Sequence, residues 1–483
     1  MTVFLATRDD FTLPTLRRVA LGWEEVELAP DALERIAQAH ASFQEYVEHN
    51  RDGFIYMVTS GGGPDAGKRY SPAEARERRQ RRMPWQGLSF GGGFLPEHTV
   101  RATALCLLPM MIEGHTGVHP SQARAVAELL AGPMPKLPVR GLTAAGEIMP
   151  LFYLLQAIPN ARSPEWLTAG FGNGCPMANG MAGVCALLSR SRLRLAELAF
   201  ALSIEAFKAP LEAYDPALAE LWGDRYEAEA LEALARLLEG AGEDRRHYQA
   251  PVSWRILPRV LGQAHRSLAM LEQAASISLR QVASNPTYVL PNDRDPLGRT
   301  LSTGAYHNGI AAPAIDRMAA CWADLAALAQ RHIVKFHKGG VSELPDRLLP
   351  PGTDITTAFS TTYLEYVPND FVEQMRLLAQ PTLLTPVEVA ASEQDDVAVP
   401  SFIAYDKERR IAELFDATIA VLCVVASQAL HVTGRPAQPP LRAFLERVRE
   451  LVPPVESSRP LGEECDALAQ AFSRAILADD SFL

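Results

Sequence analysis

The chain has 483 residues and a formal net charge of −11 at pH 7. A chain of this length can bury a substantial core and form two or three structural regions. The excess of acidic residues argues against a nucleic-acid partner, because contacts with a phosphate backbone draw on clustered Lys and Arg side chains.

The N-terminal segment, Met1 to Asp10, has no basic stretch followed by a long apolar one, so we expect no signal peptide and a cytoplasmic protein. The longest apolar run, about residues 419–426, is far shorter than the roughly 20 residues that a membrane span needs, and it predicts a buried helix and no membrane partner. Scattered cysteines without a Cys-x-x-Cys pair predict neither a zinc site nor a disulfide framework. These thiols are Cys106, Cys175, Cys185, Cys321, Cys423 and Cys465.

Helical periodicity dominates the chain after residue 95. Apolar residues at helical steps predict helices over residues 188–204, 228–238, 317–332 and 410–430. Candidate strands are few and short, and residues 53–58 are an example. Clusters of Gly and Pro mark breaks between these elements. The pattern therefore predicts a mainly α fold.

Two local patterns suggest binding sites but favour a structural interpretation. The basic run at residues 76–82 is dense, and we interpret it as a solvated helix face or a loop near the active site. His115 and His119 are four residues apart, yet Gly117 between them weakens a helical metal site and no third ligand is obvious. We therefore expect structural histidines and no metal.

The most informative motif is Thr143-Ala144-Ala145-Gly146-Glu147-Ile148-Met149-Pro150-Leu151. It resembles the Ala-Ser-Gly-Asp-Leu-Ala-Pro-Leu loop of the aromatic amino acid ammonia-lyase and aminomutase family, which includes histidine ammonia-lyase. In that family the Ala-Ser-Gly triad cyclises and dehydrates into a methylidene-imidazolone, an electrophile that attacks the substrate. Dehydration needs a leaving hydroxyl on the middle residue, and Ala145 has only a methyl group. We therefore expect no methylidene-imidazolone at Ala145 and Gly146, and no other cofactor.

Further motifs resemble the same family, in the family's order, over about residues 10 to 400. Residues 56–63 align without a gap on its Tyr-Gly-Val-Asn-Thr-Gly-Phe-Gly loop. The other matches are Asn179-Gly180 with Asn-Gly-Thr, Ser278-Leu279-Arg280 with Ser-Leu-Arg, Ser302 to His307 with Ser-Gly-Gly-Asn-Phe-His, and Glu393-Gln394-Asp395-Asp396 with Asn-Gln-Glu-Asp.

The resemblance implies a fold and an assembly. It implies an aspartase/fumarase-like bundle of long central helices with a mixed N-terminal active-site region. We place that region, with the Tyr56 loop and the altered triad at 144–146, in residues 1–220, and a central and C-terminal helical region in residues 221–483. The family forms a homotetramer whose active sites combine residues of three subunits, so the resemblance implies the same here.

The resemblance also implies roles for two residues. Tyr56 falls on the family's catalytic tyrosine, the base that removes the β-proton of the substrate. A tyrosine has an ordinary pKa of about 10, so this role requires positive charge or hydrogen bonds that favour the phenolate. Arg280 falls on a clamp that binds the substrate carboxylate through two parallel hydrogen bonds. The structural alternatives are a core tyrosine and a surface arginine.

Four more residues match substrate-binding positions of the family. The Asn179 amide could hydrogen-bond a substrate, although Asn-Gly is also a turn signal. Tyr306 replaces a phenylalanine and could pack against the substrate. Asp395 replaces a glutamate and is one methylene shorter, and Phe90 takes a position that helps to select the substrate ring.

Other family positions have changed together with the triad. Ile277 stands for a tyrosine, Ala274 for a glutamine and Ala305 for an asparagine. Most of these changes remove polar groups that surround the electrophile or the amine. They favour a lineage that stopped using the cofactor over a laboratory serine-to-alanine change, which stays open.

The implied function is a cofactor-free carbon-nitrogen lyase that acts on a small carboxylate, an aromatic or betaine amino acid, by base-catalysed removal of a β-proton. Ergothionase resembles this situation, because it is a family relative that expels trimethylamine from a betaine without the methylidene-imidazolone. The alternatives are a scaffold reused for another cofactor-independent step, such as a cyclisation or isomerisation in specialised metabolism, and a catalytically inactive or engineered homologue.

Overall fold

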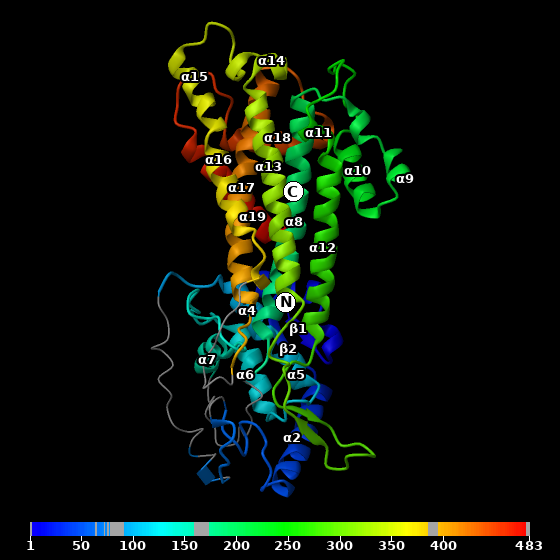
Figure 1. Ribbon diagram of the computed structural model, residues 1–483, viewed down its shortest axis with the longest axis vertical. Helices are drawn as coiled ribbons and strands as arrows, with labels where there is room; N and C mark the ends of the chain where they lie inside the picture. Colours follow the sequence, from blue (N-terminus) through cyan, green and yellow to red (C-terminus); the bar gives the residue numbers. More distant parts are fainter. Residues whose placement is uncertain are drawn as a thin grey trace. The chain divides into compact units, whose positions relative to one another are not determined.

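The computed structural model describes residues 2–62, 65–71, 73–74, 77, 91–158, 173–384 and 395–479 (Figure 1). The chain forms two compact units, and each unit combines three separate stretches of sequence. Unit 1 contains Met1–Leu187, Leu271–Ile315 and Pro381–Asp406, and unit 2 contains Leu188–Met270, Asp316–Gln380 and Lys407–Leu483. The division at residue 220 stays a prediction, since these units are groups of packed segments and not consecutive domains.

Four long helices contribute residues to both units. They are α8 (Pro176–Ala206), α12 (Leu257–Arg280), α13 (Ala311–Phe336) and α17 (Ser401–Thr433). They contain the predicted helical segments 188–204, 317–332 and 410–430, and α10 (Arg225–Leu237) covers most of 228–238. The mainly α fold predicted from the sequence is confirmed.

Unit 1 also contains further helices and two small sheets. The sheets pair β1 with β2 in parallel and β3 with β4 antiparallel. The strands are β1 (Thr2–Leu5), β2 (Glu25–Leu28), β3 (Thr287–Val289) and β4 (Arg299–Leu301). The helices are η1 (Arg8–Asp10), α1 (Leu13–Leu16), the π-helix η2 (Arg17–Leu21), α2 (Pro30–His49), α4 (Glu97–Leu105), α5 (Leu108–Ile112), α6 (Pro120–Ala131), α7 (Ile148–Ala157) and η8 (Thr382–Leu384).

The strand predicted over residues 53–58 is wrong, because these residues form a turn. The N–H groups of Val58, Thr59 and Ser60 all donate to the carbonyl oxygen of Ile55, at 3.0, 2.9 and 3.1 Å. Ile55 and Val58 are three residues apart and both belong to one buried cluster with Phe43 and Tyr288. A turn brings side chains at this spacing to one side, whereas an extended strand would point them to opposite faces.

Unit 2 is a helix bundle. Side chains on its parts of the four long helices contact one another: His265 of α12 bonds Glu197 of α8 at 2.7 Å, and Trp322 of α13 bonds Glu408 of α17 at 3.3 Å. The remaining elements of unit 2 are η5 (Leu211–Tyr214), α9 (Leu218–Trp222), α11 (Val252–Arg255), α14 (Gly339–Ser342), η6 (Asp346–Leu348), α15 (Ile355–Thr362), η7 (Tyr363–Glu365), α16 (Val367–Leu378), α18 (Pro439–Leu451) and α19 (Gly462–Ala478).

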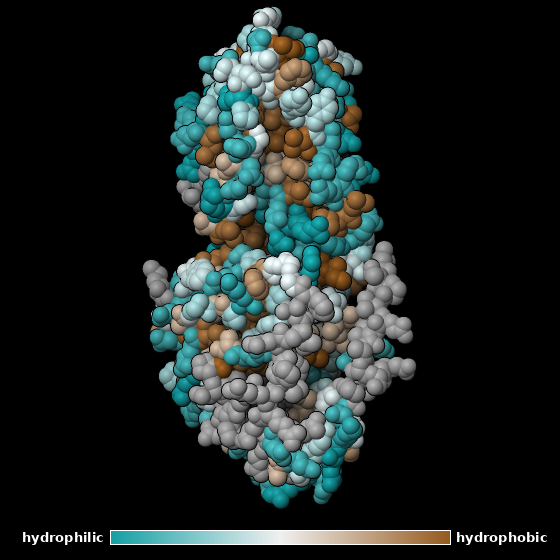
Figure 2. All heavy atoms as spheres, turned by 90° about the vertical axis from the view of Figure 1, so that its left-hand side faces the viewer, coloured by the Kyte–Doolittle hydropathy of each residue, from teal (hydrophilic) through white to brown (hydrophobic). Residues whose placement is uncertain are grey.

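Helix α17 contains the apolar run at 419–426 that predicts a buried helix. By length and composition this helix could cross a membrane, but 83% of its most apolar window is buried inside the protein. Burial of this kind is typical of a core helix. Some apolar side chains do reach the surface of the molecule, where Figure 2 shows them in brown between polar side chains in teal.

Candidate active site

The altered triad lies against the first turn of α8, and the side chain of Glu147 makes the connection. Its Oε2 and Oε1 oxygens accept hydrogen bonds from the backbone N–H groups of Met177 and Ala178, at 2.5 and 2.7 Å. The first N–H groups of a helix have no partner within it, and Pro176 at the start of α8 has no N–H to satisfy. Glu147 therefore caps α8 from a distant part of the chain.

The electrostatic environment of Glu147 is that of a buried acid. Burial raises the pKa of this carboxyl group to about 8, although the two backbone hydrogen bonds oppose the shift. Burial and the neighbouring Glu147 also raise the pKa of the Cys106 and Cys175 thiols. The capping carboxyl group thus lies in an environment that disfavours additional negative charge.

The backbone of the triad is held on both sides. The N–H of Val399 donates to the carbonyl oxygen of Ala144 at 2.9 Å, and Ala145 is 8% exposed. Gly146 has a φ of +69°, in the left-handed region that favours glycine. A Cβ at Gly146 would lie 3.5 Å from the Cβ of Tyr306 and 3.6 Å from two of its ring atoms, so Tyr306 packs directly on the triad.

Asn179 lies within α8, one residue after the Ala178 amide that Glu147 binds, and not in a turn. Its side chain is buried, and its Oδ1 accepts hydrogen bonds from Asn308 Nδ2 and Gln281 Nε2, both at 2.8 Å. The Cys175 thiol makes a longer contact with the same oxygen, at 3.5 Å. The predicted substrate-binding amide is therefore held in a fixed orientation.

Arg280 is the last residue of α12, next to Gln281. Its side chain is 46% exposed, and its Nη1 lies 4.0 Å from Oδ1 of the exposed Asp9. Ion pairs between exposed groups contribute little to stability, so this contact would not prevent Arg280 from binding a substrate carboxylate. The exposure agrees equally with the surface alternative stated above, and the clamp stays a prediction.

The Tyr56 loop is anchored to a separate cluster of unit 1. Its neighbours Ile55 and Val58 pack against buried Phe43 and Tyr288, while Tyr56 itself is half-buried. Met57 has a φ of +59°, which is uncommon for a residue with a side chain. A Cβ at Gly62 would lie 3.2 Å from the Tyr56 hydroxyl oxygen, so this glycine leaves room for the phenol.

The remaining predicted site residues are only partly defined. Asp395 is half-buried, four residues before the Val399 that binds the triad. Burial and the neighbouring Asp396 raise its pKa. Phe90 lies outside the described residues, as does the basic run at 76–82 apart from Glu77.

The histidines and cysteines considered in the sequence analysis have the following surroundings in the described structure. His115 Nδ1 bonds the carbonyl oxygen of Tyr288 at 2.9 Å, and His119 Nδ1 bonds the Ser121 hydroxyl at 2.8 Å. Among the described residues no group of three or more His, Cys, Asp or Glu side chains could hold a metal ion. All six cysteines are buried free thiols.

The structure thus packs Tyr306 on Gly146 and ties the triad loop, through Glu147, to the turn of α8 that contains Asn179. Arg280 precedes Gln281, which bonds Asn179, and the convergence of the Arg280 side chain on this place stays a prediction. The assembly of Tyr56 with them stays a prediction. Sequence reasoning did not assign a role to Glu147, Gln281 or Asn308. Their positions gave a partial signal: Glu147 follows the triad, Gln281 follows Arg280, and Asn308 precedes a helix, where Asn often binds backbone N–H groups.

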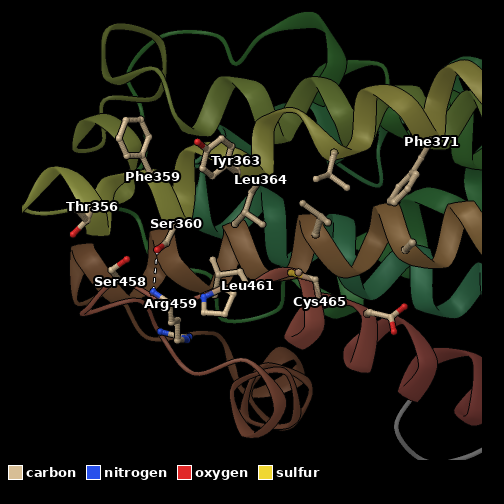
Figure 3. Close-up of a pocket in the computed structure, with 16 residues that line it drawn as sticks. Thr356, Phe359, Ser360, Tyr363, Leu364, Phe371, Ser458, Arg459, Leu461 and Cys465 are labelled. Atoms are coloured by element: carbon tan, nitrogen blue, oxygen red, sulfur yellow. Dashed lines mark hydrogen bonds between the residues drawn. The ribbon is translucent and has the colours of Figure 1, made fainter.

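A separate cavity of about 640 Å³ lies in unit 2, and Figure 3 shows it. Its walls include Phe359, Tyr363 and Leu364, and it contains none of the predicted site residues. Arg459 lies at this cavity, but its guanidinium already donates to both oxygens of Glu464, at 2.8 and 3.2 Å. Its backbone N–H donates to Ser360, the dashed line in Figure 3. We place the active-site candidate in unit 1 because the polar groups converge there.

Comparisons with known proteins show the family to which this chain belongs. The family model for aromatic amino acid lyase matches residues 11–162 and 168–450. Histidine ammonia-lyase from Symbiobacterium thermophilum is 27% identical over 492 residues, which cover 95% of this chain and 94% of that protein.

Two solved structures share the fold. Tyrosine aminomutase from Streptomyces globisporus superposes with a TM-score of 0.83 at 21% identity, covering 97% of this chain and 96% of that one. Ergothionase from Treponema denticola, an ergothioneine-degrading enzyme, superposes with a TM-score of 0.84 at 17% identity, covering 99% and 100%. The family model spans most of the sequence and the fold agrees, so this chain belongs to the aromatic amino acid lyase family.

Proposed function

We propose that this protein eliminates an amine from an amino-acid-type carboxylate without a methylidene-imidazolone, and that its preferred substrates are betaines, in which the α-nitrogen is quaternary. One observation carries the proposal. Ala145 occupies the middle of the triad and its methyl group has no hydroxyl to lose, while Tyr306 still packs on the neighbouring Gly146 and Asn179 is still held in a fixed orientation.

The reaction needs a base and a leaving group. The Tyr56 phenolate takes the β-proton of the substrate, and the C–H electron pair forms the carbon-carbon double bond. The Cα–N bond breaks in the same step, and its electron pair leaves with the amine. The products are an unsaturated carboxylate and a neutral tertiary amine, with the proton on Tyr56. No oxidant or second substrate is required.

The substrate carboxylate and the cation have separate partners in this proposal. The exposed Arg280 guanidinium binds the carboxylate through two parallel hydrogen bonds. The ring of Tyr306, packed on Gly146, faces the quaternary ammonium, which aromatic rings attract through cation–π interactions. Phe90 is the second aromatic candidate for this contact.

A quaternary ammonium suits a site without the electrophile for two reasons. A quaternary nitrogen keeps its positive charge at every pH and so always leaves as a neutral amine, whereas a primary amine must be protonated before it can leave as ammonia, a departure that the family's electrophile assists. A primary ammonium also has three N–H donors that need acceptors on desolvation, while a quaternary ammonium has none. The loss of polar groups at Ala274, Ile277 and Ala305 is therefore tolerable for a betaine.

The test is a substrate panel followed by ultraviolet absorbance of the conjugated product. We expect product from Nα-trimethylhistidine or Nα-trimethylphenylalanine and none from histidine, phenylalanine or tyrosine. Trimethylglycine is the control, because it has no β-proton to lose. Product from the free amino acids, or no product from any trimethylated acid, would contradict the proposal.

We also propose a homotetramer in the cytoplasm. The family resemblance supports the assembly. Light scattering should give four times the 52.8 kDa of one chain. A stable monomer would contradict sites built from three subunits.

A further inference from the structure

The side-chain amides of Asn308, just before α13, and of Gln281 both meet the side chain of Asn179. Two of the groups around Asn308 have a certain polarity: the backbone N–H groups of Ile310 and Ala311 both donate to Asn308 Oδ1, at 3.0 Å each. The oxygen and nitrogen of a side-chain amide are assigned from such networks. Because a backbone N–H can only donate, the atom of Asn308 that faces both groups is the oxygen.

The polarity of Asn308 determines that of its neighbours. Its Nδ2 donates to Asn179 Oδ1 at 2.8 Å and to Ser278 Oγ at 2.9 Å. Gln281 Nε2 donates to the same Asn179 oxygen at 2.8 Å. Asn179, Asn308 and Ser278 are buried. A reversed Asn179 amide would place its N–H groups against two other donors in a buried site, which is costly.

The free end of Asn179 is therefore a donor. Its Nδ2 makes no hydrogen bond to a described residue. This nitrogen is also not one of the fully buried polar atoms that lack a hydrogen-bond partner. Asn179 follows Ala178, to which Glu147 ties the triad loop, and Gln281 follows Arg280. The donor thus lies in the region to which the carboxylate clamp and the triad both belong.

We propose that Asn308 is a positioning residue that fixes Asn179 as a hydrogen-bond donor, and that this donor binds a carboxylate oxygen of the substrate. A carboxylate only accepts hydrogen bonds, so it matches the Nδ2 group of Asn179, which can only donate. The inference rests on the proposed function for the identity of the substrate. It assigns to Asn179 a role beside Arg280 in holding the carboxylate.

The test compares two probes, cinnamate and its neutral amide cinnamamide, by titration calorimetry. Asn308→Asp keeps an acceptor for the Ile310 and Ala311 N–H groups but replaces the donor toward Asn179 with an acceptor. The Asn179 amide should then turn and direct its oxygen to the ligand. We expect cinnamate affinity to fall at least about 10-fold, or about 1.4 kcal/mol, and cinnamamide affinity to change less than about 3-fold.

The matched control is Asn292→Asp. Asn292 Oδ1 also accepts from two backbone N–H groups, those of Arg294 and Asp295 at 3.0 and 3.1 Å, but it lies in an exposed turn. Binding of both probes should match the wild type. Gln281→Glu is a second route, because it also places an acceptor against Asn179 Oδ1, and it replaces Asn308→Asp if that variant does not fold.

The two affinities test whether Asn308 orients Asn179, an arrangement that we call the amide relay. A selective loss of affinity for cinnamate supports the relay, whereas an equal loss for both probes, or no loss, overturns it. A wild-type protein that binds neither probe overturns the carboxylate assignment. These titrations do not depend on turnover, so the elimination proposal can fail while the relay holds, and the relay can fail while trimethylated acids are converted.

Discussion

The carboxyl group of Glu147 accepts a hydrogen bond from the backbone N–H of Ala178, which is 31 residues away in the sequence. A second bond joins it to Met177, so one buried side chain holds the triad loop against the start of α8. Burial raises its pKa to about 8. This relationship connects the stability of the site to pH.

The first prediction concerns that pH dependence. In the unfolded chain Glu147 ionises near the ordinary pKa of about 4.3, whereas the folded protein retains its proton up to about pH 8. The unfolded state therefore binds fewer protons than the folded state between these values. As the pH rises, the free energy of unfolding falls. We expect the Tm of the wild type to fall from about pH 4.5 to about pH 8.

Glu147→Gln tests the assignment of this slope. The variant has no titrating group at the cap, so its Tm should fall less over the same range, measured by calorimetry. It should also melt below the wild type at pH 5, because its amide oxygen accepts one backbone bond while its NH₂ opposes the other N–H. Glu450→Gln, at an exposed position, is the control. An equal fall of Tm with pH in Glu147→Gln and in the wild type would contradict the prediction.

The long helices were predictable because their signal is local. Apolar residues at helical steps in 188–204 and 317–332 mark faces that α8 and α13 bury. The turn at 53–58 was not predictable in the same way. Its apolar residues resemble a strand, and the turn is stabilised by burial of Ile55 and Val58 in the cluster with Phe43, a contact between residues that are distant in the sequence.

Site residues could be predicted where they belong to a short continuous motif. Contacts between residues that are distant in the sequence could not. The triad and Asn179 could be located from short motifs. The bond between Asn308 and Asn179 spans 129 residues, and neither residue predicts the other through spacing or periodicity. Hydrogen-bond polarity depends on which groups meet in space, so the donor character of Asn179 required the structure.

The second prediction concerns the close approach of α8 to α4 at Gly180. A Cβ at this position would lie 2.9 Å from the backbone carbon of Ala102 and the backbone nitrogen of Thr103. Backbone atoms cannot move aside as a flexible side chain can. Gly180→Ala should therefore lower the free energy of unfolding in urea by about 1–3 kcal/mol. Gly242→Ala, where nothing lies within 4 Å, is the control and should change it by less than about 1 kcal/mol.

The third prediction places proton removal on Tyr56. Tyr56→Phe keeps the ring that the loop packs but removes the hydroxyl, so the fold and cinnamate binding should stay. Turnover of a trimethylated acid should fall by about 100-fold or more, the usual size of a general-base contribution. Tyr46→Phe, at another partly buried tyrosine, is the control. Full turnover in Tyr56→Phe would assign the base to another group.

The fourth prediction distinguishes orientation from charge at Arg280. Arg280→Lys keeps the positive charge and loses the planar fork that binds a carboxylate through two bonds. We expect KM for a trimethylated acid to rise by about 10-fold, as for loss of one charged hydrogen bond, with a smaller effect on kcat. Arg299→Lys, on β4, is the control. Unchanged KM in Arg280→Lys would favour the surface alternative.

The fifth prediction concerns Ala145 and separates two histories of the chain. The intact mass of the wild type should equal the sequence mass, because a triad without a serine cannot lose the hydroxyl that cyclisation and dehydration require. Ala145→Ser restores that hydroxyl, and a mass lower by two waters would show that the ring forms.

Even with the ring, this variant would lack the polar groups that the family has at positions 274, 277 and 305, where this chain has Ala274, Ile277 and Ala305. We therefore expect no ammonia release from histidine, phenylalanine or tyrosine. Robust ammonia-lyase activity in this single variant would mean that the hydroxyl alone was lost, and the chain would then be an inactivated ammonia-lyase.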